Sequence, residues 1–537
     1  MNSRLGRTSA YFILIVLSMV VFFYWASKKE VWFCDEVYTY ESANGVESEW
    51  PNNHPDKWIS GADVESYLAA DDSDFRFKAI SDILYGDHVP LYFWIFRTVS
   101  VLFFRGSASI WIGLSINLFF FLLAISCCYF FVCKSIGAVP AAVLTFLVMV
   151  LSRVGICQFT VLRMYMMMLC AEILLLVLSF RIIGREKWSA ATLVDYVLIY
   201  AVTTVGLMTH YDFWIFYGFC AAFCCLFLLG KAFKQWKTLH AKVLWSYQTK
   251  LVYGWCISFA AALLTLDRLF PYWKWNLHKG KGQTALSSLV MLSHDKLDNI
   301  GWGFKRLVAV LFGEKAPVLP VIIAFYALIV ISLIVLSRKE RFAEVRAIVI
   351  TMAVSVAYRL VVCYTLPDAR EERYLWCAIT LEALCFGYSV IVLIQTFLKS
   401  KTLKYIIAVV LCMGVTLLNV LNLNRGNNIS YLMYPDKNIP LLESYSDVPW
   451  LVYGPICGVY SYYDWIIPKE LCFVTEDKAE EDAQAVEYLK DKDSFILYVN
   501  EGLLEDAVDF IGSVNGTDYS VEYLMQSTNL KVYAIKR

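Results

Sequence analysis

An acidic pair closely follows the first apolar segment of the chain. Residues 10–26 form an apolar run, and Asp35 and Glu36 come shortly after it, beside Tyr38. An ionisable group at the edge of a membrane is costly, so its presence there indicates a functional site. An apolar wall on one side raises the pKa of a carboxyl group, which suits a proton acceptor. The alternative is an interfacial turn whose acids are solvated.

Four further segments combine charged and aromatic side chains at the ends of apolar runs. They contribute Asp87, His88 and Tyr92; Arg163 and Tyr165; His210 and Tyr211; and Arg370, Arg373 and Tyr374. The distribution of Lys and Arg in the loops places all of these segments on one side of the membrane. Simple membrane anchors would occur on both sides, so the convergence favours a shared site. Arginine donates paired hydrogen bonds to phosphate oxygens, which makes the three arginines candidate phosphate ligands.

Each of these segments also has an ordinary structural interpretation. Tyr92 and Tyr211 have the composition of interfacial anchors, and the Arg370 and Arg373 side chains can reach the membrane surface as snorkelling charges. His210 is also compatible with a cap or a core position. Asp87 and His88 precede a proline, which is typical of a helix start.

The elements that would position these residues are membrane helices. The chain has 537 residues, of which 59% are hydrophobic and 18% charged, a balance that excludes a soluble protein of this size. The net charge is zero, which argues against a nucleic-acid partner. Eleven apolar segments are evident, near residues 10–26, 110–133, 138–152, 160–182, 191–209, 211–230, 251–270, 317–336, 347–366, 373–397 and 403–422. We expect an α-helical polytopic membrane protein with about 11–13 transmembrane helices.

Basic loops predict the orientation of the chain in the membrane. The loop 231–250 contains five Lys and no acid, so we expect it, and the N-terminus, to be cytoplasmic. The loop that begins at residue 27 and everything after about residue 422 then lie outside, in a multi-pass protein of the cell membrane. The apolar segment 89–104 is short and contains Arg97, so we expect it to lie along the outer face or to re-enter; a crossing stays open if a thirteenth span exists elsewhere.

Two regions outside the spans have their own patterns. The first external loop, 27–88, belongs to the predicted transmembrane domain 1–425 and shows helical spacing of apolar residues in its second half, which predicts short amphipathic helices. Residues 426–537 alternate short apolar runs with helical patterns, which predicts a small extracytoplasmic α/β domain. This domain contains no Gly-rich phosphate loop, so we assign it no cofactor. Whether Cys457 and Cys472 in this region form a disulfide is left open by the sequence.

Segment by segment, the chain resembles the bacterial C-type membrane glycosyltransferases, a group similar to protein O-mannosyltransferases and to the lipid A aminoarabinose transferase. The matching stretches are Phe33-Cys-Asp35-Glu36-Val-Tyr-Thr, Asp87-His88-Val89-Pro90-Leu91-Tyr92, Leu162-Arg163-Met164-Tyr165, Thr209-His210-Tyr211 and Glu372-Arg373-Tyr374-Leu375. The resemblance covers about residues 10–425. The chain departs from the family pattern at Val89, where proline is usual, and in the insertion around Trp50–Trp58.

The resemblance implies an inverting, hexosyl- or mannosyl-transferase-like enzyme. Its donor would be a polyprenyl-phosphate-linked sugar held at the membrane lipid, and its glycosyl acceptor a protein, a wall glycopolymer or a lipid outside the membrane. Asp35 would be the base, with Glu36 in the same catalytic pair. An acid at the place of Asp87 helps to hold a divalent metal in the aminoarabinose-type members, so a metal is left open here.

Two other functions compete with this interpretation. A transporter or flippase for a lipid-linked or cell-envelope substrate would show inverted repeats and midspan charges; the chain has no clear internal repeat and few midspan charges, such as Glu172 and Glu382. The second alternative is a non-catalytic membrane scaffold.

Overall fold

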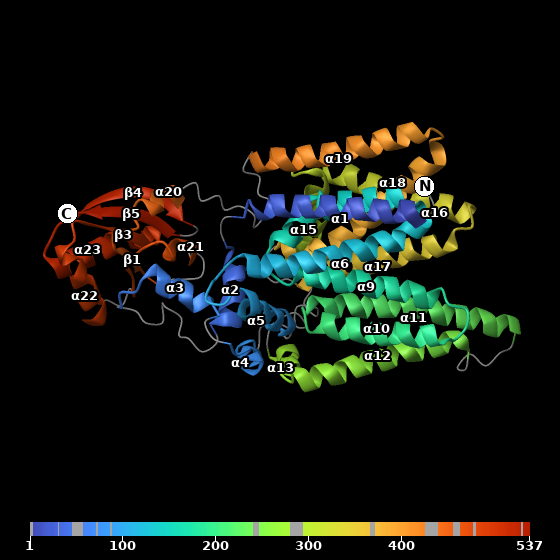
Figure 1. Cartoon of the computed structure of the whole chain (residues 1–537), viewed down its shortest axis with the longest axis horizontal. Helices are drawn as coiled ribbons and strands as arrows, with labels where there is room; N and C mark the ends of the chain where they lie inside the picture. Colours follow the sequence, from blue (N-terminus) through green and yellow to red (C-terminus); the bar gives the residue numbers. More distant parts are fainter. Residues whose placement is uncertain are drawn as a thin grey trace. The chain divides into compact units, whose positions relative to one another are not determined.

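The computed structural model describes residues 4–29, 32–45, 57–70, 73–85, 88–239, 246–279, 294–365, 371–424, 439–454, 462–475, 480–527 and 530–537. The chain divides into two compact units, whose elements are labelled in Figure 1. The first, the helical unit, comprises residues 1–26, 84–92 and 117–429. The second, the mixed unit, comprises residues 27–83, 93–116 and 430–537. The contacts thus group most of the loop 27–88 with the C-terminal residues.

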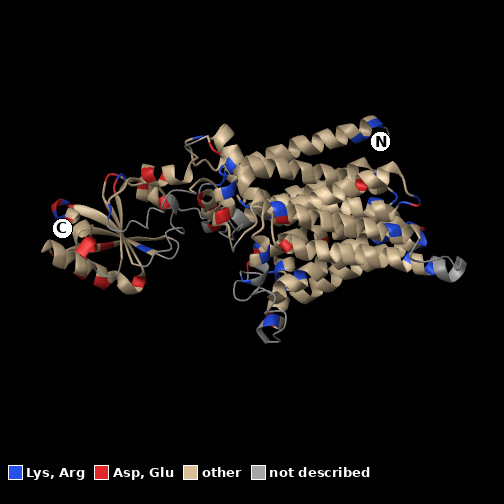
Figure 2. Cartoon of the chain, turned by 90° about the horizontal axis from the view of Figure 1, so that it is seen from below, with Lys and Arg blue, Asp and Glu red and all other residues tan. Residues whose placement is uncertain are grey.

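Nine helices in the described part of the chain are long and apolar enough to cross a membrane. They are α1 (Arg4–Ala26), α6 (Trp111–Ile136), α9 (Tyr165–Ile183), α10 (Ala190–Leu207), α11 (Asp212–Leu239), α12 (Tyr247–Leu269), α16 (Val318–Arg338), α17 (Phe342–Thr365) and α18 (Trp376–Phe397), the last preceded by the 3-10 turn η4 (Glu372–Leu375). The chain is therefore a polytopic α-helical membrane protein, as the sequence predicts. Figure 2 shows how sparse charged residues are along these helices.

The segment predicted as a straight span at 138–152 is a broken helix. Helix α7 (Ala138–Thr145) continues as a π-helical turn, η2 (Phe146–Val150), and then bends by 63° into α8 (Arg153–Thr160). Ser152 caps α8, because its Oγ accepts the backbone N–H of Gly155 at 3.1 Å. A Cβ atom on Gly155 would lie 2.3 Å from the Met149 carbonyl oxygen, so the tight bend requires glycine there. Counting this pair as one span gives ten candidates among the described residues, compared with the 11–13 expected.

Two further helices are apolar. Helix α5 (Leu91–Phe103) has 13 residues, about 20 Å of helix, which agrees with the expectation that residues 89–104 do not cross as a simple span. Helix α19 (Lys401–Asn424) has 24 residues and includes the apolar stretch 402–417. The helical unit also contains α13 (Trp273–His278) and α15 (His294–Phe312).

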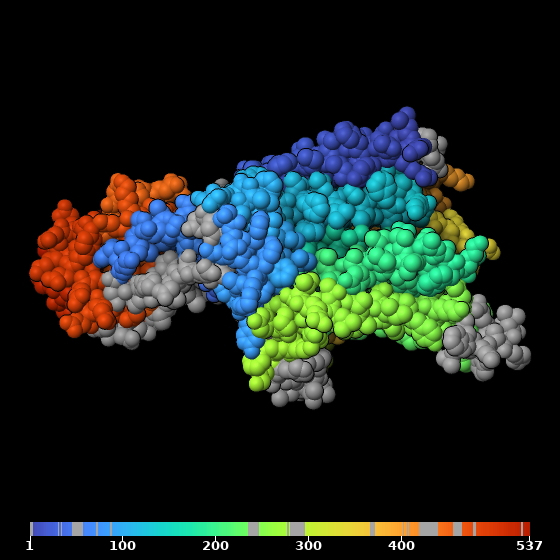
Figure 3. Space-filling view, turned by 60° about the horizontal axis from the view of Figure 1, so that its bottom comes forward, coloured from blue at the N-terminus to red at the C-terminus, as the bar shows by residue number. Residues whose placement is uncertain are grey.

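Helix α9 is the most deeply buried of the nine helices, because 78% of its most apolar 18-residue stretch lies inside the structure. Helices α10 and α12 lie side by side, as Figure 3 shows. A glycine permits this approach, because a Cβ on Gly254 would lie 2.4 Å from the Tyr196 ring. The Tyr196 hydroxyl donates to the Leu251 carbonyl at 2.6 Å, so a buried polar group is satisfied at the same contact.

The C-terminal part of the mixed unit is a small α/β domain, as predicted. Its five strands are β1 (Trp450–Tyr453), β2 (Leu471–Val474), β3 (Ser494–Val499), β4 (Ser520–Ser527) and β5 (Leu530–Lys536), in the order β2-β1-β3-β5-β4. Strands β1, β2 and β3 are parallel, whereas β5 pairs antiparallel with β3 and β4. The sequence analysis missed β4, an edge strand that is exposed over most of its length.

Helices and turns complete this domain and the loop 27–88. The domain contains α20 (Ile439–Glu443), α21 (Tyr462–Trp465), α22 (Glu480–Glu487), η6 (Tyr488–Asp491), η7 (Glu501–Leu503) and α23 (Leu504–Asn515). The loop forms α2 (Cys34–Asn44), α3 (Gly61–Leu68) and α4 (Phe77–Ile83), which confirms that its second half contains short helices. Cys472 is buried in β2, and Cys457 lies outside the described residues.

The loop 27–88 pairs with the edge of the C-terminal sheet. Ile59 and Leu471 form an antiparallel bridge with N–H···O distances of 2.9 and 2.7 Å. The Trp58 indole donates to the Ala485 carbonyl at 3.0 Å, and its ring lies 4.8 Å from that of Tyr488. The insertion that distinguishes this chain from the family pattern therefore leads directly into a contact between the loop and the C-terminal domain.

Candidate active site

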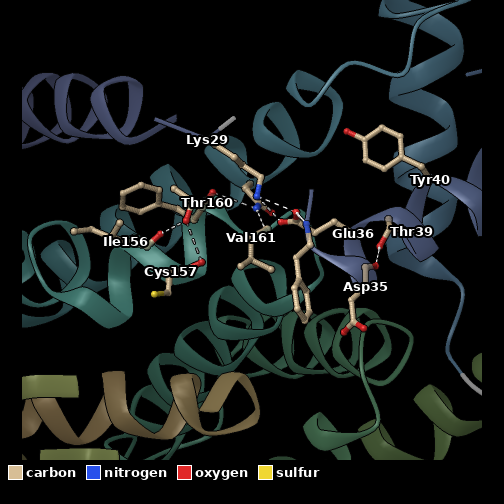
Figure 4. Close-up of polar contacts among 12 residues, drawn as sticks. Lys29, Asp35, Glu36, Thr39, Tyr40, Ile156, Cys157, Thr160 and Val161 are labelled. Carbon is tan, nitrogen blue, oxygen red and sulfur yellow. Dashed lines mark hydrogen bonds and ion pairs between the residues drawn. The ribbon is translucent and has the colours of Figure 1, made fainter. Parts of the chain in front are cut away.

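Glu36 is buried and accepts hydrogen bonds from Lys29 and from the backbone of Phe33. Lys29 Nζ lies 2.8 Å from Glu36 Oε1 and 2.9 Å from Oε2, and both side chains are fully buried. The backbone N–H of Phe33 donates to Glu36 Oε2 at 2.7 Å, which satisfies a donor at the start of α2. Figure 4 shows this arrangement. Glu36 is therefore a capping and charge-pairing residue that fixes the beginning of α2.

Asp35 is adjacent in sequence but differs in its surroundings. Its side chain is half-buried and points away from the Lys29–Glu36 pair (Figure 4). Neighbouring residues on a helix project about 100° apart, so the two carboxyl groups do not share a proton. The local fold thus holds one acid in an ion pair and presents the other from the first turn of α2.

Helix α2 is anchored along its length within the mixed unit. The Tyr40 hydroxyl donates to the Ser109 carbonyl at 2.8 Å, and its ring stacks on Trp32 at 4.9 Å. Asn44 Nδ2 donates to the Leu68 carbonyl at 2.8 Å. Because both ends are fixed, the position of Asp35 is defined by the fold of the loop.

The helical unit brings three predicted aromatic residues together. The Tyr165 ring lies 5.7 Å from that of His210 and 6.2 Å from that of Tyr374, and His210 lies 6.2 Å from Tyr374. Tyr165 also contacts Trp376 edge-on at 5.7 Å. Tyr165 lies at the start of α9, His210 in the α10–α11 connection and Tyr374 in η4, directly before α18, so the three rings meet at the ends of helices.

Arg163 lies beside His88 in the same unit. Arg163 Nη2 is 3.2 Å from His88 Nε2, and the arginine side chain is almost fully buried. The backbone N–H of Leu91 donates to the Met208 carbonyl at 3.0 Å, which ties the His88 segment to the end of α10. A guanidinium group thus lies against a histidine in a mostly apolar part of the molecule.

His210 is oriented by the residues that follow it. Its Nδ1 accepts the backbone N–H of Asp212 at 3.0 Å and lies 3.5 Å from Asp212 Oδ2. The neutral ring therefore carries its proton on Nε2. The Tyr358 hydroxyl, from α17, lies 3.5 Å from the same carboxylate oxygen and donates to the Tyr374 carbonyl at 3.0 Å. Tyr358 links two of the predicted segments, and it has no distinguishing signal in an aromatic-rich sequence.

The remaining predicted residues differ in their burial. Arg373 is largely buried, and its guanidinium lies 5.2 Å from the Tyr374 ring centre. Tyr92 is fully buried near the start of α5, whereas Tyr211 is half-exposed. Asp87 and Arg370 lie outside the described residues. Asp35 and Glu36 belong to the mixed unit, and the aromatic cluster belongs to the helical unit.

A network of charges beside this cluster was missed by the sequence analysis. Arg153 and Arg306 pair with Glu314 and Glu372, and Glu372 directly precedes Arg373. The four residues come from distant parts of the sequence, so no local pattern connects them. Only the acid-rich start of the Arg373 motif could have drawn attention to Glu372.

The described residues do not assemble a metal site. No group of three or more His, Cys, Asp or Glu side chains in the described ranges has the geometry to hold an ion. Asp87, where the resemblance leaves a metal open, lies outside the described residues, and His88 Nε2 lies 3.2 Å from Arg163 Nη2.

Comparison with solved structures identifies the fold. Over 98% of both chains, the structure superposes on ArnT, a lipid A aminoarabinose transferase from Cupriavidus metallidurans, in its apo state, with a TM-score of 0.52 and 13% identity. The form of that protein bound to undecaprenyl phosphate gives a TM-score of 0.50 and 14% identity over 97% of both chains. The chain therefore has the C-type membrane glycosyltransferase fold. No family model and no curated protein sequence matches the chain.

Proposed function

We propose that the chain transfers a sugar from a polyprenyl-phosphate carrier to an acceptor on the extracytoplasmic side of the membrane. The fold is shared over 98% of the chain with a membrane glycosyltransferase, and one structure of that protein contains undecaprenyl phosphate. The observation that carries the proposal is the difference in surroundings between the two acids, Asp35 and Glu36. Glu36 is paired with Lys29, whereas the half-buried Asp35 side chain points away from that pair at the start of α2.

Asp35 is the general base in this mechanism. A sugar on a polyprenyl phosphate already has a good leaving group, so the reaction requires removal of the acceptor's hydroxyl proton. Asp35 accepts this proton as the acceptor oxygen attacks the anomeric carbon and the bond to phosphate breaks. A single displacement of this kind inverts the anomeric configuration.

Arg163 and Arg373 are the candidates that stabilise the departing phosphate. Both side chains are largely buried, so their attraction for a phosphate is weakened little by water. Arg163 lies beside His88, and Arg373 lies over the Tyr374 ring, so each guanidinium is held by a neighbouring ring. The Tyr165, His210 and Tyr374 rings provide the apolar and hydrogen-bonding surface beside them.

The substitution Asp35→Asn tests the proposal. It preserves shape and removes the base, so turnover of polyprenyl-phosphate sugars by purified protein should fall roughly 10²–10⁴-fold while donor binding persists. Glu65→Gln is the matched control, because Glu65 is an exposed acid of the same loop. Near-normal turnover in well-folded Asp35→Asn protein would exclude Asp35 as the base.

The active face is proposed to be extracytoplasmic, from the basic loop 231–250. A cysteine introduced as His240→Cys into a Cys-depleted chain should resist membrane-impermeant maleimides in intact cells and react after permeabilisation. A cysteine introduced as Glu65→Cys should react in intact cells. The reverse pattern would contradict the proposed side of the reaction.

A further inference from the structure

Two arginines and two glutamates form a compact charge network at the helix ends of the helical unit. Arg153 opens α8, Arg306 belongs to α15, Glu314 lies in the connection from α15 to α16, and Glu372 begins η4. All four lie in a unit whose helices are otherwise mostly apolar. Their side chains are 11%, 17%, 42% and 8% exposed, in that order, so Glu314 is the accessible member.

The two arginines converge on Glu314. Arg306 donates to both of its carboxylate oxygens, from Nη1 at 3.1 Å and from Nη2 at 3.0 Å. Arg153 Nη1 donates to Oε1 at 3.1 Å. Two guanidinium groups therefore contact one carboxylate, and Arg306 does so in the planar, forked geometry with which arginine also binds phosphate.

Glu372 holds the other side of the arginines. Its Oε2 pairs with Arg306 and lies 3.4 Å from Arg153 Nη2, and its Oε1 accepts the Trp376 indole N–H at 3.3 Å. Glu372 is buried and belongs to the same short turn as Arg373, so it is an integral part of the framework. Glu314, in contrast, is partly exposed to solvent.

The charge balance makes Glu314 replaceable. The two arginines and Glu372 alone carry a net charge of about +1, and the N-terminus of α8, at Arg153, adds partial positive charge. Glu314 neutralises this excess. Burial acts to raise the pKa of Glu314, but the charges of Arg306 and Arg153 and their hydrogen bonds outweigh it, so the pKa is lowered and the carboxylate remains ionised. Arg306 Nε is buried and has no hydrogen-bond partner in the described part of the chain.

The network is adjacent to the candidate active site. Trp376 donates to Glu372 and packs edge-on against Tyr165 at 5.7 Å, and Tyr165 belongs to the aromatic cluster. One indole ring thus connects the arginine pair with the rings beside the proposed phosphate ligands.

We propose that Arg153 and Arg306 form a second phosphate-binding position, which Glu314 occupies until the phosphate of a prenyl lipid displaces it. The identity of the lipid rests on the proposed function. The binding position itself rests on the two arginines and their exposed carboxylate partner. Entry of the lipid phosphate breaks the contacts of Glu314 and leaves those of Glu372 intact.

Glu314→Gln is the decisive variant, because it removes the competing charge from a partly exposed loop position. Full-length protein in neutral-lipid nanodiscs is titrated with undecaprenyl phosphate, with undecaprenol and inorganic phosphate as separate arms. The variant should bind undecaprenyl phosphate about two- to fivefold more tightly than the parent, as expected for loss of a partly exposed ion pair. Lys315→Gln, which removes an exposed charge from the neighbouring position, should change the affinity less than twofold.

Arg306→Gln should weaken the same binding at least tenfold, whereas Lys305→Gln, an exposed change on the same helix, should have little effect. If Glu314→Gln increases the affinity for inorganic phosphate by the same factor, the ligand is free phosphate and the assignment to a lipid is overturned. Unchanged or weaker binding in Glu314→Gln overturns the proposal even if Arg306→Gln does not fold. Sugar transfer by the parent protein is measured separately. Transfer without the expected change in lipid binding overturns the second phosphate position alone, whereas absence of transfer counts against the proposed function.

Discussion

The pair formed by Lys29 and Glu36 allows a structural acid to be distinguished from a catalytic one by experiment. Glu36→Gln is the informative change, because an amide oxygen can still accept the Phe33 N–H and thus preserves the cap of α2. The change removes only the negative charge. Lys29 is fully buried, so its ammonium group is then left without its carboxylate partner in a poorly hydrated position.

The expected cost follows from this burial. Removing one member of a buried ion pair destabilises a protein by about 3–5 kcal/mol. At about 2–4 °C per kcal/mol for a unit of this size, the apparent melting temperature should fall by roughly 6–20 °C. The double variant Lys29→Met/Glu36→Gln removes both charges and should be more stable than Glu36→Gln alone. Glu65→Gln, an exposed acid in the same loop, should melt within about 1–2 °C of the parent protein.

The assay is thermal unfolding of detergent-solubilised protein, measured in parallel with turnover at a temperature where all variants are folded. Under these conditions Glu36→Gln should retain much more turnover than Asp35→Asn. A Glu36→Gln protein with parental stability and severely reduced turnover would refute the reasoning, because Glu36 would then act in the chemistry and its ion pair would contribute little.

Three further outcomes are expected. Arg163→Ala should weaken binding of undecaprenyl phosphate by about 1.5–3 kcal/mol in a titration, with Arg163→Lys intermediate; parental affinity in both would exclude the contact. Arg359 and Glu382 form a fully buried pair between α17 and α18, with Nε and Oε1 2.9 Å apart, so Arg359→Met should lower the melting temperature more than Arg359→Met/Glu382→Leu does; equal values would argue against the pair. Burial raises the pKa of the Glu41 carboxyl, and a hydrogen bond from Tyr67 only partly opposes this. The folded state therefore retains a proton that the unfolded chain loses above the ordinary pKa of 4.5, and stability is lost as pH rises through this window. Glu41→Gln should raise the melting temperature at pH 7 more than at pH 4, and an equal change at both values would contradict the assignment.

Periodicity and composition were sufficient to predict the membrane class and the C-terminal α/β domain. Long apolar runs leave a helix as the only way to satisfy the backbone, and short apolar runs between turns favour strands, so these features depend on nearby residues alone. Strand β4 was missed because an exposed edge strand has little apolar patterning. The break between η2 and α8 was missed because it depends on the close approach of Gly155 to the Met149 carbonyl.

Sequence motifs also identified the residues that cluster at the helix ends, among them Arg163, Tyr165, His210 and Tyr374, since each lies next to an apolar run. The different roles of Asp35 and Glu36 were decided by the tertiary structure, because the fold buries Lys29 against only one of two adjacent acids. The same is true of the charge network of Arg153, Arg306, Glu314 and Glu372. Its members are far apart in the sequence, and an ion pair between distant residues leaves no periodic pattern from which it could be predicted.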